Sequence, residues 1–405
     1  MNVCVIGGGA AGLIAAINAA SLGNKVRILE LRDRVGKKIL ATGNGKCNMT
    51  NADMSLSHYH GLMSEEASRT LVKSVFDMFS PDDTIRFFEE LGVPVMFKNG
   101  YAYPRSEQAA SVLEVLRLKL ESLSVDVCCD CKVKSIEKKD SKFIIYTSVN
   151  TYSADRVILA CGSGASLKQN DEAGYHLAKN LGHTIIKPLP SLVPILCENK
   201  IFKSLSGIRI KGSIEVYDDN NNLLASDQGE LQLTSYGVSG IPAFMVSHVV
   251  AKHIENGSKL HLLLDFFPEL SKDELLELLK KRVADCSYKM AETFLIGLLN
   301  KNLSLAIIKD CGIDYKLNVT MLSNKMLENI VDHIKSFKAE IAGTKSYQDA
   351  QICAGGVSVD EIKTNLESKL VSGLYFAGEM IDVHGDCGGY NLQWAFSSGS
   401  VCGKQ

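Results

Sequence analysis

Three glycines with a fixed spacing follow the first apolar segment of the chain. The segment NVCVI, residues 2–6, has the length and composition of a buried strand, and GGGAAG follows it directly. Gly7, Gly9 and Gly12 form the pattern G-x-G-x-x-G, and the small apolar residues after them predict a helix. The three glycines suit a tight turn, a close approach of the backbone to a pyrophosphate, and close packing of helix on strand. The free N–H groups at the start of such a helix then face the phosphates.

An acidic residue ends the second predicted strand. The segment KVRILE, residues 25–30, ends in Glu30, 18 residues after Gly12. A carboxylate at this place accepts hydrogen bonds from both ribose hydroxyls of an adenosine and repels a 2′-phosphate. The order of strand, glycine turn, helix, strand and acidic residue therefore predicts a dinucleotide site rather than a structural turn. FAD and NAD both remain open at this point.

A basic stretch short of strand-forming residues, residues 31–51, follows Glu30. A simple nicotinamide dehydrogenase would continue here with another helix and strand. This stretch instead carries Arg32, Arg34, Lys37, Lys38 and Lys46, with the turn signal GNG at 43–45. It predicts an extended loop that follows a long polyanionic ligand beyond its adenosine half. A solvated basic loop is the alternative.

Two later segments repeat the pattern of an apolar strand followed by glycine. They are RVILACGSG, residues 156–164, and GLYFAGEMID, residues 373–382, and GDCGGYNLQWAFSSG, residues 385–399, then predicts a helix that begins near Asn391. We interpret these segments as the part of the fold that covers a flavin. The pyrophosphate would lie on the helix after Gly12 and the ring on this second helix N-terminus, whose positive dipole end stabilises negative charge on a reduced ring.

The order of these motifs resembles that of one family of bacterial flavoproteins. GGGAAG, GKKILATGNGKCNMTN, YPRSEQAASV, AGGV and GLYFAGEMIDVHGDCGGYNLQWAFSSG together resemble the BaiN/YhiN-like proteins over nearly the whole chain. Members are described as aminoacetone oxidases or as 3-dehydro-bile acid delta-4,6-reductases. The resemblance implies an α/β fold in which a Rossmann-like FAD-binding domain is interrupted by a β-barrel domain that carries a small helical insert. Lys46 stands where many relatives carry Arg, and His384 and Cys387 stand at positions expected to vary. These differences are expected to affect the choice of substrate.

The motifs and the resemblance together imply a set of site residues. The expected cofactor-binding residues are Gly7, Gly9, Ala10, Ala11, Gly12, Glu30, Leu31, Lys37, Lys38, Gly43, Asn44, Lys46, Cys47, Asn48, Val133, Ala160, Gly162, Gly378, Glu379, Asp386, Gly389, Tyr390, Asn391 and Leu392. By the resemblance, the backbone of Val133 lies beside the adenine, and Glu379 and Asp386 contact the ribityl chain or a phosphate.

Few catalytic side chains are expected, because a flavin carries the hydride chemistry itself at its N5. His384 is the candidate proton donor, since the unperturbed pKa of histidine lies near neutrality, and a loop histidine bonded to a carbonyl is the alternative. Tyr101, Tyr103, Arg105 and Tyr236 are the candidate substrate residues. An arginine beside aromatic residues suits an acidic or carbonyl-bearing substrate, and it equally suits a packed loop.

Changes in composition predict the domain boundaries. Three prolines at 188–194 precede short strand-like segments that favour a barrel or a sandwich, and a capping box of Ser271 and Glu274 then opens a helical stretch. We expect an FAD-binding domain at 1–190 and 346–405, a β-barrel domain at 191–268 and 338–345, and a helical insert at 269–337. Residues 64–122 are expected to be helical, with a helix that starts at Ser80 and Pro81, and residues 132–148 to form a hairpin.

These features predict an FAD-dependent oxidoreductase. We expect an NAD(P)H-driven reductase of an unsaturated small molecule, such as an enone or a dehydro-bile acid. An amine oxidase of the aminoacetone type that uses oxygen, a flavin-bearing module without turnover and an NAD-only dehydrogenase are the alternatives. The segment GSGASLK, residues 162–168, lacks the third glycine of a nicotinamide domain, so we expect either that NADH or NADPH docks transiently or that oxygen closes the cycle.

Bulk composition bears on partners and location. The chain has 405 residues and a formal net charge of −2, without a block of Lys and Arg, so nucleic acid is not expected as a partner. Of its 12 cysteines only 128–131 cluster, without a second ligand pair, so reduced thiols and no metal site are expected. No signal peptide or membrane segment is recognisable, which favours a cytoplasmic protein, and the oligomeric state is left open.

Overall fold

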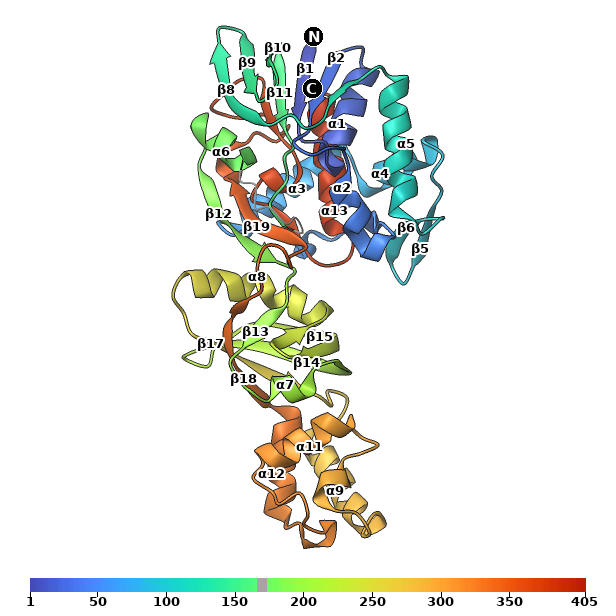
Figure 1. Ribbon diagram of the computed structural model, residues 1–405, viewed down its shortest axis with the longest axis vertical. Helices are drawn as coiled ribbons and strands as arrows, with labels where there is room; N and C mark the ends of the chain where they lie inside the picture. The colour runs from blue at the N-terminus through green and yellow to red at the C-terminus, as the bar shows by residue number, and fades with distance from the viewer. Residues whose placement is uncertain (166–172) are drawn as a thin grey trace. The chain divides into compact units, whose positions relative to one another are not determined.

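The computed structural model describes residues 1–165 and 173–405, so the end of the 162–168 segment lies outside the described residues. The chain forms two compact units (Figure 1): Met1–Leu189 with Gln351–Gln405, and Pro190–Ala350. The candidate cofactor residues all belong to the first unit. No helix of the described ranges has the length and apolar character needed to cross a membrane.

A parallel five-stranded sheet forms the centre of the first unit. Its order is β20-β11-β1-β2-β7, and its strands are β1 (Asn2–Ile6), β2 (Lys25–Leu29), β7 (Asp126–Cys128), β11 (Arg156–Leu159) and β20 (Leu374–Phe376). The chain adds strands on one side of β1 and then on the other, so the order reverses next to β1. Ligands of such open sheets bind beyond the carboxyl ends of the strands at this reversal, where the glycine-rich loop after β1 lies.

Two helices, α1 (Ala10–Ser21) and α13 (Tyr390–Gly403), lie side by side in this unit (Figure 1). A Cβ atom on Gly399 would lie 2.3 Å from the carbonyl oxygen of Ala11, and one on Gly403 would lie 2.4 Å from that of Ala15. The glycines therefore let the helix backbones touch. Because both contacts advance in the same direction along the two helices, α1 and α13 run parallel.

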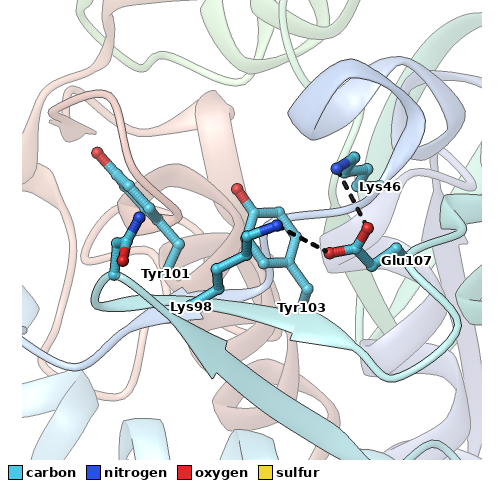
Figure 2. Close-up of a pocket in the computed structure, with 6 residues that line it drawn as sticks. Lys46, Lys98, Tyr101, Tyr103 and Glu107 are labelled. Carbon is cyan, nitrogen blue, oxygen red and sulfur yellow. Dashed lines mark hydrogen bonds and ion pairs between the residues drawn. The ribbon is translucent and has the colours of Figure 1, made fainter.

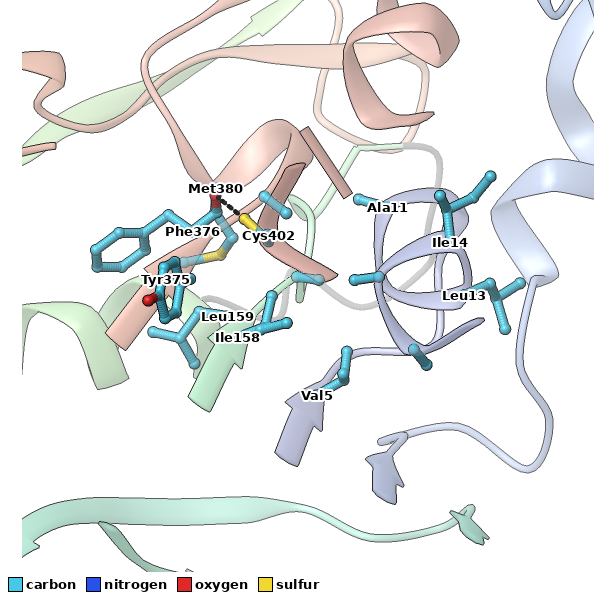
Figure 3. Packing of buried hydrophobic residues seen from close by; sticks show 14 of the residues in the cluster. Val5, Ala11, Leu13, Ile14, Ile158, Leu159, Tyr375, Phe376, Met380 and Cys402 are labelled. Atoms are coloured by element: carbon cyan, nitrogen blue, oxygen red, sulfur yellow. Dashed lines mark hydrogen bonds between the residues drawn. The ribbon is translucent and has the colours of Figure 1, made fainter. Parts of the chain in front are cut away.

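Buried apolar side chains join these helices to the sheet (Figure 3). Val5 of β1, Leu13 and Ile14 of α1, and Phe376 of β20 are all buried. Cys402 of α13 packs in the same cluster, and its Sγ donates to the carbonyl oxygen of Phe376 over 3.2 Å. A closely packed core therefore supports the β1–α1 turn.

The remaining elements of the first unit surround this core. They are α2 (Lys37–Ala41), η1 (Thr42–Gly45), β3 (Thr50–Asn51), η2 (Leu56–His58), β4 (Tyr59–His60), α3 (Glu65–Met78), α4 (Pro81–Glu90), β5 (Val95–Lys98), β6 (Tyr101–Pro104), α5 (Ala109–Ser122), β8 (Val133–Lys139), β9 (Lys142–Thr147), β10 (Thr151–Ala154), α6 (Ala173–Asn180), β12 (Ile185–Ser191), β19 (Ile352–Val357), η4 (Val359–Glu361), η5 (Gly378–Met380) and β21 (His384–Gly385). The expected hairpin at 132–148 is confirmed, and β10 extends it to three strands.

The expectation of helix throughout 64–122 is wrong for residues 95–104, which form the β5–β6 hairpin. Asn99 and Gly100 connect its strands with φ angles of 53° and 85°. A two-residue turn with both φ angles positive matches the right-handed twist of paired strands, and Asn-Gly is its preferred sequence. The expected start of α4 is confirmed: Ser80 and Asp83 form a reciprocal capping box, with Pro81 in the first turn.

The second unit contains a closed barrel with the strand order β13-β16-β15-β14-β17-β18. Of the two expected alternatives, a barrel or a sandwich, the structure therefore shows the barrel. Helices α9 to α12 lie in sequence between β17 and β18, and Ser271 and Glu274 form the expected capping box at the start of α9. The elements are β13 (Ile195–Cys197), α7 (Phe202–Leu205), β14 (Ile208–Asp218), β15 (Leu223–Thr234), β16 (Gly237–Ser239), α8 (Ile241–Glu255), β17 (Leu260–Asp265), α9 (Lys272–Asp285), α10 (Ala291–Phe294), α11 (Lys301–Asp310), η3 (Val319–Met321), α12 (Asn324–Lys335) and β18 (Phe337–Thr344).

Candidate functional site

The glycine-rich turn after β1 has a different steric environment at each glycine. Gly7 has a φ of +103°, and a Cβ atom on it would lie 2.4 Å from the carbonyl oxygen of Ala160. A Cβ atom on Gly12 would lie 1.9 Å from the carbonyl oxygen of Gly7, whereas one on Gly9 would have no atom within 4 Å. Gly7 thus serves the turn and Gly12 the packing, while Gly9 borders open space in front of α1.

The N-terminus of α1 is suited to an anion. The amide of Leu13 donates to the carbonyl oxygen of Gly9 in the first intrahelical bond, so the amides of Ala10, Ala11 and Gly12 precede that ladder. The N-cap Gly9 offers no side chain to bond them, and the first turn has no acidic residue. Three N–H groups and the positive end of the helix dipole therefore face the open space at Gly9.

Glu30 lies directly after β2 and holds the glycine-rich turn. Its Oε2 accepts the amide of Gly8 over 2.6 Å, and its Oε1 accepts the amide of Arg32 over 2.8 Å. Each carboxylate oxygen retains acceptor capacity after one bond. The same side chain can therefore fix the backbone and accept the two hydroxyls of a ribose.

We expect Glu30→Ala to lower FAD affinity by about 10-fold or more, because the loss of a charge-assisted hydrogen bond costs about 1.5–3 kcal/mol. The measurement is a fluorescence titration of flavin-free protein with FAD. Glu114→Ala is the control, since Glu114 lies on α5 and pairs only weakly with Arg117 over 3.4 Å. Wild-type affinity in Glu30→Ala would contradict the adenosine pocket.

The N-termini of α1 and α13 point in the same direction but lie at different positions along the common direction of the two helix axes. Because Ala11 lies opposite Gly399, residue 398 is level with Ala10, and Tyr390 lies eight residues before it. At 1.5 Å per residue, the start of α13 extends about 12 Å beyond the start of α1. This step fits a ligand whose pyrophosphate and ring are separated by a sugar-alcohol chain, as in FAD.

Two glycines precede α13, and the short strand β3 packs against them. Gly388 and Gly389 have φ angles of +138° and +99°, and a Cβ atom on Gly389 would lie 2.6 Å from the carbonyl oxygen of Thr50. The Asn51 Nδ2 donates to the carbonyl oxygen of Gly388 over 2.9 Å. Strand β3, which ends the basic stretch, therefore lies directly against the turn into α13.

An unpaired polar atom lies at the same place. Asn48 Oδ1 is buried and has no hydrogen-bond donor within the described part of the chain, and it lies 3.0 Å from the Cβ position of Gly389. A buried acceptor without a donor costs free energy. A ligand N–H beside the start of α13, such as that of a flavin ring, would satisfy it.

Asn391 fixes the loop before α13. Its Nδ2 donates to the carbonyl oxygens of Gly385 and Asp386, and its Oδ1 accepts the amide of Gly385. The expected role of Asn391 at a flavin is untested. Its observed side-chain contacts are with this loop, and the amides of Tyr390, Asn391 and Leu392 precede the intrahelical ladder of α13.

The basic stretch 31–51 is partly anchored in the unit. Lys38 Nζ lies 2.6 Å from Glu379 Oε2, and both side chains are largely buried. A Cβ atom on Gly162 would lie 3.8 Å from Glu379 Oε2, and Ser163 Oγ lies 3.4 Å from Oε1. Lys37 instead pairs with the exposed Asp33. The structure thus brings Lys38, Gly162 and Glu379 together, whereas Lys37 is part of the surface.

The other expected cofactor residues lie around this arrangement. Cys47 is fully buried, and burial raises the pKa of its thiol to about 12, while its expected contact with the cofactor stays a prediction. Gly43, Asn44 and Cys47 have positive φ angles of 55°, 54° and 61°. Leu31 follows β2, Val133 begins β8, Ala160 follows β11, and Gly378 lies in η5.

A cavity of about 150 Å³ lies between the basic stretch and the β5–β6 hairpin (Figure 2). It is lined by Lys46, Lys98, Asn99, Tyr101, Tyr103 and Glu107. Both lysines point towards the Glu107 carboxylate, with Nζ to oxygen distances of 3.2 Å for Lys46 and 3.8 Å for Lys98. Tyr101 Cε1 lies 3.1 Å from the Cβ position of Gly388, so the cavity adjoins the turn into α13.

The four candidate substrate residues do not all lie in one place in the structure. Tyr101 and Tyr103 line this cavity, where burial raises the pKa of Tyr103. Arg105 follows β6, and its charge helps to lower the pKa of Glu107. Tyr236 belongs to the second unit, where Lys345 Nζ lies 4.3 Å from its ring centre. Two of the four residues therefore line this cavity, and the substrate role of all four stays a prediction.

Two histidines that the sequence analysis passed over hold Asp386. His58 Nδ1 lies 2.8 Å from Asp386 Oδ2, and His60 Nε2 lies 3.0 Å from Oδ1. Burial opposes ionisation of Asp386, but hydrogen bonds from His60 and His58 outweigh it and lower the pKa of the carboxyl. Asp386 is thus engaged by two side chains, and its expected contact with the ribityl chain or a phosphate stays a prediction. His58 ends η2 and His60 belongs to β4, so the alternation of a single strand did not indicate their common partner.

His384 lies beside these histidines. Strands β4 and β21 pair antiparallel with His60 opposite His384, and the centres of the two imidazole rings are 5.5 Å apart. His384 is buried, at 2% exposure. The ring of His58 stacks on Tyr390, the first residue of α13, over 4.4 Å. In the described ranges no three His, Cys, Asp or Glu side chains gather as a metal-binding group.

Comparison with known proteins identifies relatives over the whole chain. Residues 1–405 match the family described as HI0933-like protein Rossmann domain. The 3-dehydro-bile acid delta(4,6)-reductase of Clostridium scindens is 38% identical, covering 100% of this chain and 98% of that protein. The ribosomal RNA dihydrouridine synthases of Haemophilus influenzae and Escherichia coli are 30% and 24% identical, covering 98% and 100% of this chain and 96% and 97% of those proteins.

The expectation that nucleic acid is not a partner finds no support in these relatives, because two of them are named for a reaction on ribosomal RNA. A net charge near zero describes the chain as a whole and does not exclude a local site for RNA. The resemblance inferred from the motifs is confirmed. The full-length match and the identity to a curated reductase show that the chain belongs to the HI0933-like Rossmann family, and that it is an FAD-dependent oxidoreductase.

Proposed function

We propose that the chain is an NAD(P)H-driven reductase of a carbon–carbon double bond conjugated with a carbonyl group. The observation that carries this proposal is the full-length similarity to a bile acid delta(4,6)-reductase. The stepped N-termini of α1 and α13 support it, because they provide separate positions for a pyrophosphate and a ring. When bound, FAD supplies the hydride chemistry at its N5.

The residues of the first unit have distinct tasks in this proposal. The amides at the start of α1 hold the pyrophosphate, Glu30 holds the adenosine ribose, and Asn48 and the start of α13 hold the ring. Reduction of the double bond places a hydride on the β-carbon and a proton on the α-carbon, and it consumes one NAD(P)H and one proton per turnover. His384 is the candidate source of that proton, with His60 as its neighbour.

A buried proton donor needs access to solvent. His60 and His58 are exposed at their side chains by 15% and 28%, and both bond to Asp386. The exposed carboxylate of Asp53 lies 3.3 Å from His58 Nε2. Burial disfavours charge on His58, but Asp386 and Asp53 together raise its pKa. These groups connect the surface with the neighbourhood of His384.

Anaerobic stopped-flow absorbance separates the two half-reactions. We expect NADH or NADPH to bleach the oxidised flavin band, and an added dienone to restore it, whereas a saturated ketone does not. A flavin that bleaches only with amines and is restored by oxygen would instead establish an amine oxidase. A yellow protein that never bleaches would establish a flavin-bearing module, and a colourless protein with no affinity for FAD would remove the flavin from the proposal.

A second candidate function is the reduction of uracil in RNA, which the two dihydrouridine synthases favour. The C5=C6 bond of uracil is conjugated with the C4 carbonyl, so its saturation is the same chemistry as that of an enone. The restored flavin signal distinguishes the substrates: ribosomal RNA in place of the dienone would reoxidise the reduced protein. RNA binding should then weaken steeply with salt, because phosphate contacts release counterions.

A further inference from the structure

The cavity at the β5–β6 hairpin has an excess of positive charge. Two lysines, Lys46 and Lys98, line it, and Glu107 is the one carboxylate among its lining residues. The hydrogen bond from Lys46 is the largest cause of a lowered pKa at Glu107, with the charges of Lys46, Lys98 and Arg105 adding to it. Glu107 therefore stays ionised, and its two carboxylate oxygens each face one of the two ammonium groups (Figure 2).

Both ion pairs in this cavity are accessible to solvent. The side chains of Lys46, Lys98 and Glu107 are exposed by 44%, 59% and 32%. Ion pairs with this exposure contribute little to stability, so their partners exchange readily. An incoming anion could take the place of the Glu107 carboxylate between the lysines without a large loss of stability.

The remaining lining adds specificity for a flat group. Tyr101 and Tyr103 line the same cavity, and aromatic rings favour contact with planar or apolar surfaces. Tyr101 also touches the turn at Gly388 before α13. A molecule held here by an anionic end would therefore lie beside the place assigned to the flavin ring.

We propose that the cavity of Lys46, Lys98, Tyr101 and Tyr103 binds an anionic oxygen group, a carboxylate or a phosphate, and that Glu107 occupies this place in its absence. The cavity then selects an acidic substrate, or it holds a phosphate of the nicotinamide donor. This assignment of a ligand class rests on the proposed function, whereas the anion site itself rests only on the residues of the cavity.

Opposite effects of two substitutions test the anion site. Benzoate and phenyl phosphate serve as probes and benzamide as the neutral control, in calorimetric titrations of the protein with and without FAD. Glu107→Gln removes the internal competitor and should tighten binding of the anionic probes about 10-fold, whereas Lys98→Gln should weaken it about 10-fold, each corresponding to about 1.4 kcal/mol. Benzamide should bind equally to all variants.

Matched controls use a similar pair on another hairpin. Glu137→Gln removes an exposed ion pair with Lys139 on β8, whose length is 2.9 Å, and Lys142→Gln removes an exposed lysine of β9. Neither should change probe binding. Unchanged binding of the anionic probes in Glu107→Gln and Lys98→Gln, or absent binding of these probes in the wild-type protein, would overturn the anion site. So would benzamide binding that changes between the variants as much as that of the anionic probes.

Kinetics then distinguish the two sources of the anion. If the substrate supplies it, Lys98→Gln should raise KM for a dienone bile acid and leave that for its methyl ester unchanged. If the donor supplies it, Lys98→Gln should raise KM for NADH or NADPH in flavin reduction. A protein that binds benzoate as expected but shows no nicotinamide-driven turnover would contradict the proposed reductase function while preserving the anion site.

Discussion

Gly12→Ala is expected to abolish FAD binding and to lower the free energy of unfolding by about 3 kcal/mol, the upper range for overpacking. The new Cβ atom would lie 1.9 Å from the carbonyl oxygen of Gly7 and 3.1 Å from its carbonyl carbon. Both are backbone atoms of the turn that supports the start of α1, so no flexible side chain can yield. Relief requires α1 to move away from β1, which displaces the amides that face the phosphate position.

Gly9→Ala provides the matched comparison. Gly9 has an ordinary φ of −82°, and its Cβ position has no neighbour within 4 Å, so this variant should keep wild-type stability. Its methyl group enters the open space in front of α1 and should still lower FAD affinity. Urea unfolding of the flavin-free proteins and FAD titration measure the two effects. Normal stability in Gly12→Ala would refute the packing argument, and normal FAD affinity in Gly9→Ala would refute the phosphate position.

His384→Gln is expected to slow substrate reduction about 100-fold, since a positioned general acid contributes about 10²–10⁴-fold. Flavin reduction by NAD(P)H should proceed at the wild-type rate, because that half-reaction needs no proton on the substrate. The two half-reactions are followed separately by stopped-flow absorbance of the flavin.

Because His384 is buried, its replacement could disturb the β4–β21 pairing, and two further variants address this. His60→Gln changes the partner residue on β4 and should slow the same half-reaction. His176→Gln removes an exposed histidine of α6 and should have no effect. An unchanged rate of substrate reduction in a folded His384→Gln protein would show that this histidine is only a loop residue.

Local patterns were sufficient for much of the first unit. The turn after β1, the end of β2 at Glu30 and the capping boxes at Ser80 and Ser271 depend on contacts between residues close in sequence, and all were found where expected. The Asn99–Gly100 turn was equally local, and the hairpin it connects was missed because the flanking segments were assigned to helix. The division into three domains and the individual cofactor contacts remain predictions.

By itself the sequence determined the family, the parallel sheet and the two glycine turns, because each depends on residue types at short and fixed spacing. Only the tertiary structure decided which distant side chains meet. His58 and His60 reach Asp386 from more than 320 positions away, and Lys98 and Lys46 converge on Glu107 from separate elements. The parallel, stepped arrangement of α1 and α13 likewise follows from Gly399 and Gly403 packing on the backbone of α1. Such contacts depend on the relative positions of whole elements, which packing of the core fixes and no local pattern encodes.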